Sequence, residues 1–297
     1  MTPGATGTSV SSCATKGQRD EAIAEFRAAI RFQPGDPRVR YSLGNVLMVQ
    51  GKLNEAIAEF RAAIRLEPDS AEAHCNLGQA LQLQGDYAGA LEMRRRGHEL
   101  GSRRPYWQYP SATWVKDAEH MLALAPRLPA LLRGEDKPRD HPERLAFFQM
   151  CRNAKRYAAA ARLWAEALEH DPKLGEEREV QLRQSRYIAA CAAALAGCGQ
   201  GQDDPKPDER SRARLRNQAL EWLRAELTAW GRFLDGGQPT ARASVVESLR
   251  DWEFDIELAG VRDPDALAKL PGAERGAWRS LWAEVDALLA RARGGRP

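Results

Sequence analysis

Two glycines, Gly44 and Gly51, and the lysine Lys52 form the stretch of sequence that comes closest to a phosphate-binding loop. In such a loop four residues separate the glycines, and a Ser or Thr after the lysine binds magnesium. Here six residues separate the glycines, and Leu53 follows the lysine. The spacing and the residue type therefore both argue against nucleotide binding.

Histidines and cysteines are the other residues whose types could support chemistry. They are His74, His98, His120, His141, His170, Cys13, Cys75, Cys151, Cys191 and Cys198. They form no H-E-x-x-H and no C-x-x-C motif, and a di-iron site would need the single acidic-x-x-His motif that ends at His120 to occur twice. We therefore expect no metal, no cofactor and no catalytic residue. Cys75, Cys151 and Cys191 are interpreted as small buried side chains.

Composition narrows the class of protein further. The chain has 297 residues, 43% hydrophobic and 29% charged, which is typical of a soluble folded protein. A net charge of +3 is far from the basic excess of a dedicated nucleic-acid binder. The sequence has no signal-peptide pattern and no apolar run of the ~20 residues that a membrane span requires. Scattered cysteines in odd number favour a reducing compartment, so we predict a cytoplasmic protein.

An internal repeat organises the N-terminal third of the chain. Asp20 to Pro34 and Asn54 to Pro68 are nearly identical, and a weaker copy begins at Tyr87. Equivalent positions recur every 34 residues, as in the series Ala22, Ala56 and Ala90. This period in helical sequence is typical of tetratricopeptide repeats, which the chain resembles from residue 17 to 104.

One complete unit, residues 37–70, gives a physical reason for each residue of the pattern. Gly44, Ala56 and Ala63 are small where two antiparallel helices cross. Leu43, Leu47 and Phe60 recur at helical spacing and should fill the shared core. Gly51 permits the turn between the helices, and Pro68 cannot continue the second helix. The unit therefore predicts a helix hairpin.

The remaining sequence predicts further helices and no strands. We expect a flexible N-terminus over residues 1–16, a half repeat over 17–36, and repeats over 37–70 and 71–104. Residues 105–297 read as divergent repeat-like hairpins, with a loop at 198–210. In one of these hairpins Tyr157, Ala160, Trp164, Ala167 and Pro172 take the repeat spacing. The predicted fold class is all-α: an α-solenoid of tetratricopeptide hairpins followed by divergent helical hairpins.

A second resemblance covers most of the chain beyond residue 104. The phrases YWQYPSATWVKDAEHMLALAPRLPALLRGEDKP, YAAAARLWAEAL and DPDALAKLPGAERGAWRSLWAEVDALL resemble the C-terminal region of large bacterial polypeptides in which a serine/threonine kinase domain precedes a tetratricopeptide array. The resemblance implies a non-catalytic, protein-binding portion of a kinase-linked polypeptide. The kinase motifs G-x-G-x-x-G, V-A-I-K, H-R-D and D-F-G are absent, so kinase activity is not expected here. The half repeat suggests an array that continued upstream.

The resemblance to tetratricopeptide repeats also implies where a partner would bind. The first helix of each repeat lines a concave wall that holds a partner's tail or helix. In this register the wall presents Tyr41, Asn45, Met48, Asn76, Gln79 and Leu83. Asn45 and Asn76 match two positions of repeats that clamp a C-terminal carboxylate, although most of the basic residues of that clamp are missing. A protein or peptide is therefore the expected partner.

Two alternatives remain open. The first is a ligand-binding or enzymatic helical domain in residues 105–297, which a closed apolar pocket lined by tryptophans and clustered ionisable groups would favour. The second is nucleic-acid binding through the basic patch Arg94, Arg95, Arg96, Arg103 and Arg104. We interpret this patch first as a solvated face, then as a site for an acidic partner peptide, and only then as a nucleic-acid site. In it Arg94 and Gly97 replace the core residues Phe60 and Ala63. The oligomeric state and the identity of the partner are not predicted.

Overall fold

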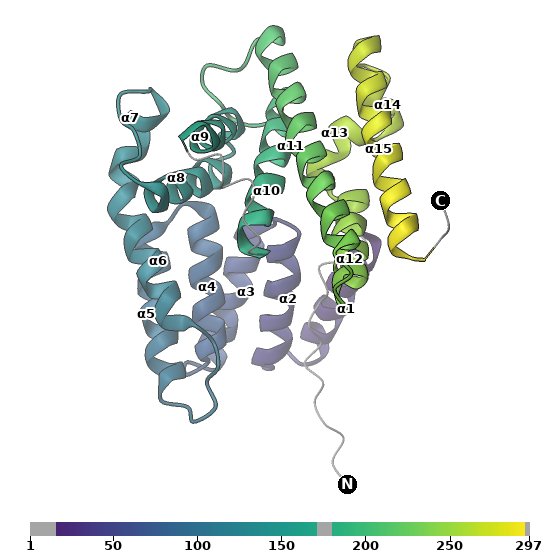
Figure 1. The fold of residues 1–297 in the computed structure, drawn as a ribbon. Coiled ribbons are helices and arrows are strands. Elements are labelled where there is room, and N and C mark those ends of the chain that lie inside the picture. Colours follow the sequence, from purple (N-terminus) through teal and green to yellow (C-terminus); the bar gives the residue numbers. More distant parts are fainter. Residues whose placement is uncertain (1–15, 171–179, 295–297) are drawn as a thin grey trace. The chain divides into compact units, whose positions relative to one another are not determined.

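The structure is a computed structural model that describes residues 16–170 and 180–294. All regular elements of this part of the chain are helices, which confirms the predicted fold class (Figure 1). The chain forms two compact units, Met1–Pro126 and Arg127–Pro297. In the first unit each helix packs against its neighbour in the sequence, whereas in the second unit α15 (Gly272–Ala292) packs against α11 (Glu209–Asp235) and α12 (Ala241–Phe254). None of the described helices combines the length and the apolarity that crossing a bilayer requires.

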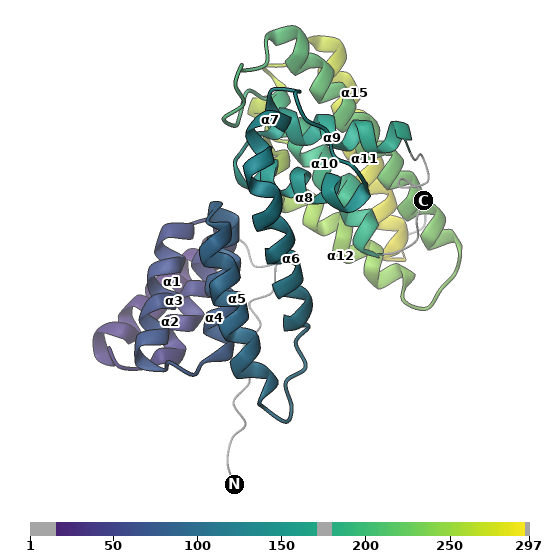
Figure 2. The same ribbon diagram turned by 90° about the vertical axis from the view of Figure 1, so that its left-hand side faces the viewer.

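The first unit is a run of six helices in which each helix packs against the next (Figure 2). They are α1 (Lys16–Phe32), α2 (Pro37–Val49), α3 (Leu53–Leu66), α4 (Ala71–Gln84), α5 (Tyr87–Ser102) and α6 (Ser111–Leu124). The pairs α2–α3 and α4–α5 are the two predicted hairpins, and α1 is the second helix of the half repeat. In the turns between the paired helices, Gly51 and Gly85 have φ of 72° and 93°, a conformation that favours glycine.

The core of this unit has the composition that the repeat predicts. Leu43, Leu47 and Phe60 are buried, and so are the small residues Ala56 and Ala63. A Cβ on Gly44 would come within 2.7 Å of the Phe60 ring, so the small residue is required where these helices cross.

The first unit extends beyond the predicted array boundary at residue 104. Helix α6 packs against α5, and the compact unit ends at Pro126. Arg94 explains part of this packing, and here the prediction of a solvated side chain was wrong. Arg94 is buried, and its guanidinium lies 5.1 Å from the centre of the Trp114 ring on α6. An arginine can take a core position because its stem is apolar and its cation binds an aromatic face.

The second unit consists of helices of less uniform length, from four to 27 residues. They are α7 (Leu128–Leu132), α8 (His141–Asn153), α9 (Tyr157–His170), α10 (Val180–Gly197), α11 (Glu209–Asp235), α12 (Ala241–Phe254), α13 (Ala259–Arg262), α14 (Pro264–Leu267) and α15 (Gly272–Ala292), with 3-10 turns η1 (Ala125–Arg127) at the unit boundary and η3 (Ile256–Leu258). The alanine-rich end of α10 is buried and packs against α9 and α11. Small side chains allow this close packing of helices around α10.

Helices α8 and α9 form the hairpin that the divergent repeat spacing predicts. Ala160, Trp164 and Ala167 are buried, and the Trp164 ring lies 5.8 Å from that of Phe148 on α8. The predicted terminating residue, Pro172, lies outside the described residues, as does most of the predicted flexible N-terminus. The hairpin therefore has the repeat's core pattern.

The segment between α10 and α11 supports the start of α9. The Asp203 carboxylate accepts hydrogen bonds from the backbone N–H groups of Ala158 and Ala159, at 3.1 and 3.2 Å. These two amides have no partner within the helix, so the carboxylate satisfies donors that would otherwise be exposed. A residue 45 positions away in the sequence thereby caps α9.

Candidate partner-binding site

Three of the predicted site residues lie together across α2 and α4. The Asn76 side-chain amide donates hydrogen bonds to the Tyr41 hydroxyl at 3.0 Å and to Asn45 Oδ1 at 2.8 Å. All three side chains are half-buried. Burial raises the pKa of Tyr41, so the hydroxyl stays protonated. The arrangement links the first helices of two successive repeats through polar groups.

The hydrogen bonds leave other polar groups of this triad unused. Asn76 uses both hydrogens of its amide, which leaves its Oδ1 as an acceptor. The Asn45 side chain also hydrogen-bonds the Tyr41 oxygen. An amide NH2 group has two hydrogens, and a hydroxyl that accepts can still donate, so Asn45 and Tyr41 each keep a donor hydrogen for a further partner. The triad therefore offers a ligand mainly donors, together with one acceptor. Carbonyl and carboxylate oxygens are the groups that such donors bind.

The other three predicted residues lie near the triad in the sequence but differ in surroundings. Met48 packs against the hydrophobic core of the first unit. Gln79 is exposed on α4, and Leu83 is half-buried near its end. Among the described residues these three make no polar contact with the triad, so their part in binding stays a prediction.

Aromatic residues lie close to Tyr41 that the sequence pattern did not assign to the site. Tyr109 and Glu72 are near enough for their charges to raise the pKa of Tyr41 further. The Tyr109 ring lies 4.8 Å from Trp107 and 6.1 Å from Trp114. The aromatic-rich stretch RPYWQY was the available signal, but only the fold brings Tyr109 to α2.

The basic patch at the end of α5 is largely neutralised. Arg95 pairs with Glu119 at 2.7 Å, and Arg104 pairs with Glu72 at 2.9 Å. Arg96 and Arg103 both pair with Glu99. Since these carboxylates compensate the cations, the patch lacks the free positive charge that nucleic-acid binding requires. The geometry does not support the nucleic-acid alternative.

A polar cluster in the second unit joins α10 to η3. Cys191, Asp255 and Glu257 hold their ligand atoms within 4.8 Å of one another. The carboxylates already have partners, because Tyr187 donates to Asp255 at 2.6 Å and Arg152 pairs with Glu257 at 3.1 Å. Burial, together with Asp255 and Glu257, raises the pKa of the Cys191 thiol well above its ordinary value. A neutral buried thiol is a poor nucleophile and a poor metal ligand.

The buried cysteines should resist alkylation in the native protein. Burial raises the pKa of Cys75 to about 11 and that of Cys151 to about 12, and Cys191 is 1% exposed. Since the thiolate is the reactive form, we expect these three residues to react at least about 100-fold more slowly than in the unfolded chain. Iodoacetamide labelling mapped by mass spectrometry measures the rates, with protein in denaturant as the control. Labelling of any of the three at the unfolded rate would contradict their burial.

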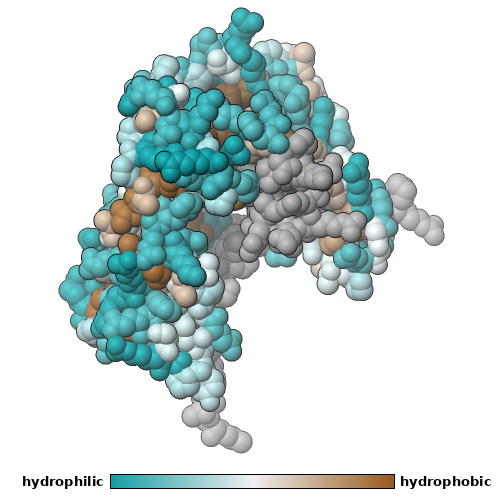
Figure 3. Space-filling view, turned by 60° about the vertical axis from the view of Figure 1, so that its left-hand side comes forward, coloured by the Kyte–Doolittle hydropathy of each residue, from teal (hydrophilic) through white to brown (hydrophobic). Residues whose placement is uncertain are grey.

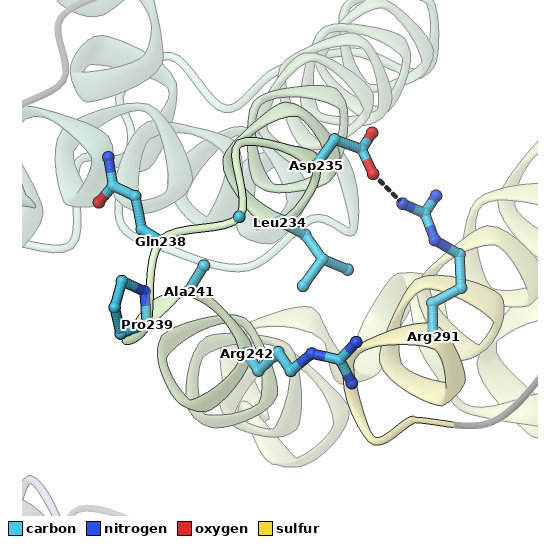
Figure 4. Close-up of a pocket in the computed structure, with 8 residues that line it drawn as sticks. Leu234, Asp235, Gln238, Pro239, Ala241, Arg242 and Arg291 are labelled. Atoms are coloured by element: carbon cyan, nitrogen blue, oxygen red, sulfur yellow. Dashed lines mark hydrogen bonds and ion pairs between the residues drawn. The ribbon is translucent and has the colours of Figure 1, made fainter.

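An open pocket of about 470 Å³ lies among the ends of α11, α12 and α15. Figure 4 shows Arg291 directed toward Asp235, with which it forms an ion pair, while Arg242 extends from α12 toward the end of α15. No tryptophan lines this pocket. It therefore lacks the closed aromatic lining that would have favoured a ligand-binding or enzymatic domain in residues 105–297.

On the face in Figure 3, hydrophilic residues predominate and hydrophobic residues gather in a few smaller areas.

One comparison with known protein families agrees with the repeat pattern. Residues 12–51 and 44–85 match the family described as TPR repeat. The crystal structure of yeast Tom70 is 14% identical over 94% of this chain and 63% of that chain, with a TM-score of 0.31. This chain thus spans less than two thirds of that structure. The comparison with curated proteins gave no match. The family match therefore supports the predicted repeats within residues 12–85.

Proposed function

We propose that the protein is a non-catalytic interaction scaffold. Its binding surface would be formed by α2 and α4, the first helices of the two repeats, and would bind a peptide segment of a partner protein. The observation that carries the proposal is the hydrogen-bonded triad of Tyr41, Asn45 and Asn76. A peptide presents a carbonyl at every residue, and the donor hydrogens that Asn45 and Tyr41 keep beside their mutual hydrogen bond suit such oxygens. Met48, Gln79 and Leu83 complete the proposed site with apolar and polar contacts.

A C-terminal carboxylate is the second ligand form that these donors suit. Asn45 and Asn76 match two positions of the repeats that clamp a carboxylate. The third member of the triad, Tyr41, supplies a neutral hydroxyl, and a positively charged side chain would bind a carboxylate more strongly. Peptides that bind the full chain can be selected from a display library and synthesised with a free or an amidated C-terminus. Equal affinity of both forms would assign the site to internal segments, whereas loss on amidation would assign it to a carboxylate.

Substitution of Asn76 by alanine tests the site itself. The change removes the two hydrogen bonds that Asn76 donates, so Asn45 and Tyr41 lose the partner that holds them across α2 and α4, and we expect binding of a selected peptide to weaken about 10-fold. Fluorescence polarisation measures the affinity. Arg61→Ala, at an exposed position on α3, is the matched control and should leave binding unchanged. If Asn45→Ala and Asn76→Ala both bind as tightly as the unaltered chain, the proposed site is wrong.

The finer part of the proposal is a link to a kinase, which rests on the resemblance of residues 105–297 to kinase-linked polypeptides. The reading frame upstream of Met1 tests it, because a continuous frame that encodes a kinase domain would support the link. The non-catalytic role has a separate test. The purified chain should transfer no phosphate from ATP, and detectable hydrolysis or transfer would contradict that role.

A further inference from the structure

The same eleven-residue sequence, EAIAEFRAAIR, occurs in two different environments in the first unit. In α3 it is packed on both sides, against α2 and against α4. In α1 it packs against α2, which follows it in the chain. Comparing equivalent residues of the two helices shows which face of α1 differs.

One edge of the two helices is equally buried. Ile23 of α1 is 4% exposed and its equivalent in α3, Ile57, is 5% exposed. The adjoining face is less buried in α1 than in α3. Phe60 is fully buried at 0% exposed, whereas Phe26 is only partly buried. Ala22 and Ala29 are half-buried, although their equivalents in α3 are fully buried.

Helix α3 shows what covers this face when it is occupied. Gly44 of α2 lies against the Phe60 ring, so close that a Cβ would come within 2.7 Å of it. Arg40 of α2 pairs with Glu59 of α3 at 3.0 Å, with both side chains about three quarters buried. The covering helix therefore carries Arg40, then Leu43-Gly44, then Leu47, all on the side that meets α3.

The next hairpin repeats this geometry. Gly78 of α4 lies against the backbone of Ala90 and the stem of Arg94, which occupy the positions of Ala56 and Phe60. Leu77 and Leu81 flank the glycine in the sequence, as Leu43 and Leu47 do in α2, and are buried. Both pairs thus place a Leu-Gly-x-x-Leu helix on the same face of a second helix.

The equivalent face of α1 keeps an uncompensated carboxylate. Glu25 corresponds to Glu59, yet it is exposed and has no ion pair or hydrogen bond within the described part of the chain. The face therefore combines a partly buried aromatic ring, two small residues and a free negative charge. This is the surface that α2 covers when it packs on α3.

We propose that this face of α1 binds an amphipathic helix of a partner polypeptide with the pattern R-x-x-L-G-x-x-L. The glycine lets the partner helix approach Phe26, the leucines cover the ring and the alanines, and the basic residue pairs with Glu25. The surface is the equivalent, on α1, of the face of α3 that α2 covers. It is a second docking surface, separate from the triad of Tyr41, Asn45 and Asn76.

The probe for this proposal is a fluorescent peptide with the sequence of residues 36–52, which includes α2. It should bind the full chain saturably, and hydrogen exchange should report protection of α1. The same peptide with Gly44→Leu should bind at least about 10-fold more weakly, because the larger side chain meets the Phe26 ring. Leucine is a better helix former than glycine, so lower helicity could not explain the loss.

Charge reversal on α1 provides the site-specific control. Glu25→Lys should weaken binding about 5-fold, and the peptide with Arg40→Glu should recover affinity for that variant. Ala24→Lys is the matched control, because its equivalent in α3, Ala58, stays exposed even where α3 is packed on both sides. Ala24→Lys should leave affinity unchanged, and so should Asn76→Ala.

Three results would overturn the proposal. One is the absence of saturable binding, and another is equal weakening by Ala24→Lys and Glu25→Lys, which would indicate general charge attraction. The third is a concentration-dependent dimer, seen by analytical ultracentrifugation and abolished by Glu25→Lys, because the occupant would then be a second copy of this chain. Failure of the triad to bind peptides would leave this test unaffected.

Discussion

Replacing Gly97 by valine should lower the free energy of unfolding of the first unit by about 3 kcal/mol. Gly97 lies at the crossing of α4 and α5. A Cβ there would come within 2.4 Å of Cys75 Sγ, 2.9 Å of the Cys75 backbone nitrogen and 3.0 Å of the Ala71 carbonyl oxygen. A side chain can rotate away, but the two backbone atoms can move only if the helices separate. The substitution therefore acts on the packing of the whole hairpin.

Gly97→Ala should have two opposing effects on the free energy of unfolding. In a helix interior alanine is favoured over glycine by about 1 kcal/mol. The clash with the backbone of α4 costs about 1–3 kcal/mol, so Gly97→Ala should be neutral or destabilising. Gly231→Ala in α11 is the control, because a Cβ there meets nothing within 4 Å and the propensity term should appear alone as stabilisation. Denaturant unfolding followed by circular dichroism, with hydrogen exchange in α4 and α5, measures both effects. Stabilisation by Gly97→Ala would show that the helices can separate at little cost.

This comparison also shows how far the sequence could predict the packing. The repeat register correctly assigned small residues to the crossing and Leu43, Leu47 and Phe60 to the core. It could not show that Gly97 must be glycine while its equivalent Ala63 is alanine. That distinction depends on a difference in helix separation, which the sequence pattern does not contain.

Arg94 illustrates a second limit. The pattern places it at a core position, and its charge led to the prediction of a solvated face. The residue that accommodates its charge, Trp114, lies 20 positions later on another helix. Periodicity describes one helix at a time, so a cation that binds an aromatic ring on a different helix is not visible in it.

The candidate site was predictable to a similar extent. The repeat register placed Tyr41, Asn45 and Asn76 on the first helices, and in the fold they are joined by hydrogen bonds. The approach of Tyr109 was not predictable, because it follows from the course of the segment between α5 and α6. The Cys191 cluster was missed for the same reason, since 64 residues separate Cys191 from Asp255.

Replacing Arg216 by alanine should destabilise the second unit by about 3 kcal/mol. Arg216 is 4% exposed and joins three helices. It donates to the Gly197 carbonyl of α10 at 2.6 Å, to Glu209 of α11 at 3.1 Å and to Glu274 of α15 at 2.6 Å. Without the guanidinium, the Gly197 carbonyl loses a partner and Glu274 loses the cation that compensates its charge. Both losses favour unfolding.

Two further substitutions separate packing from charge. Arg216→Met keeps an apolar stem against Gly197, so any loss that remains comes from the charged hydrogen bonds. Arg216→Lys keeps the charge but cannot reach three acceptors in the same geometry, and its effect should be intermediate. Arg133→Ala removes a pair with Glu135 in which both side chains are more than half exposed, and it should not change stability measurably.

Salt provides the decisive measurement for Arg216. Exposed ion pairs are screened as ionic strength rises, whereas buried pairs are screened much less. The difference in stability between the unaltered chain and Arg216→Met should therefore stay nearly constant as sodium chloride is raised. A difference that vanished in high salt would mean that Arg216 is solvated in solution. In that case the contacts that hold α10, α11 and α15 together would have to come from the apolar residues alone.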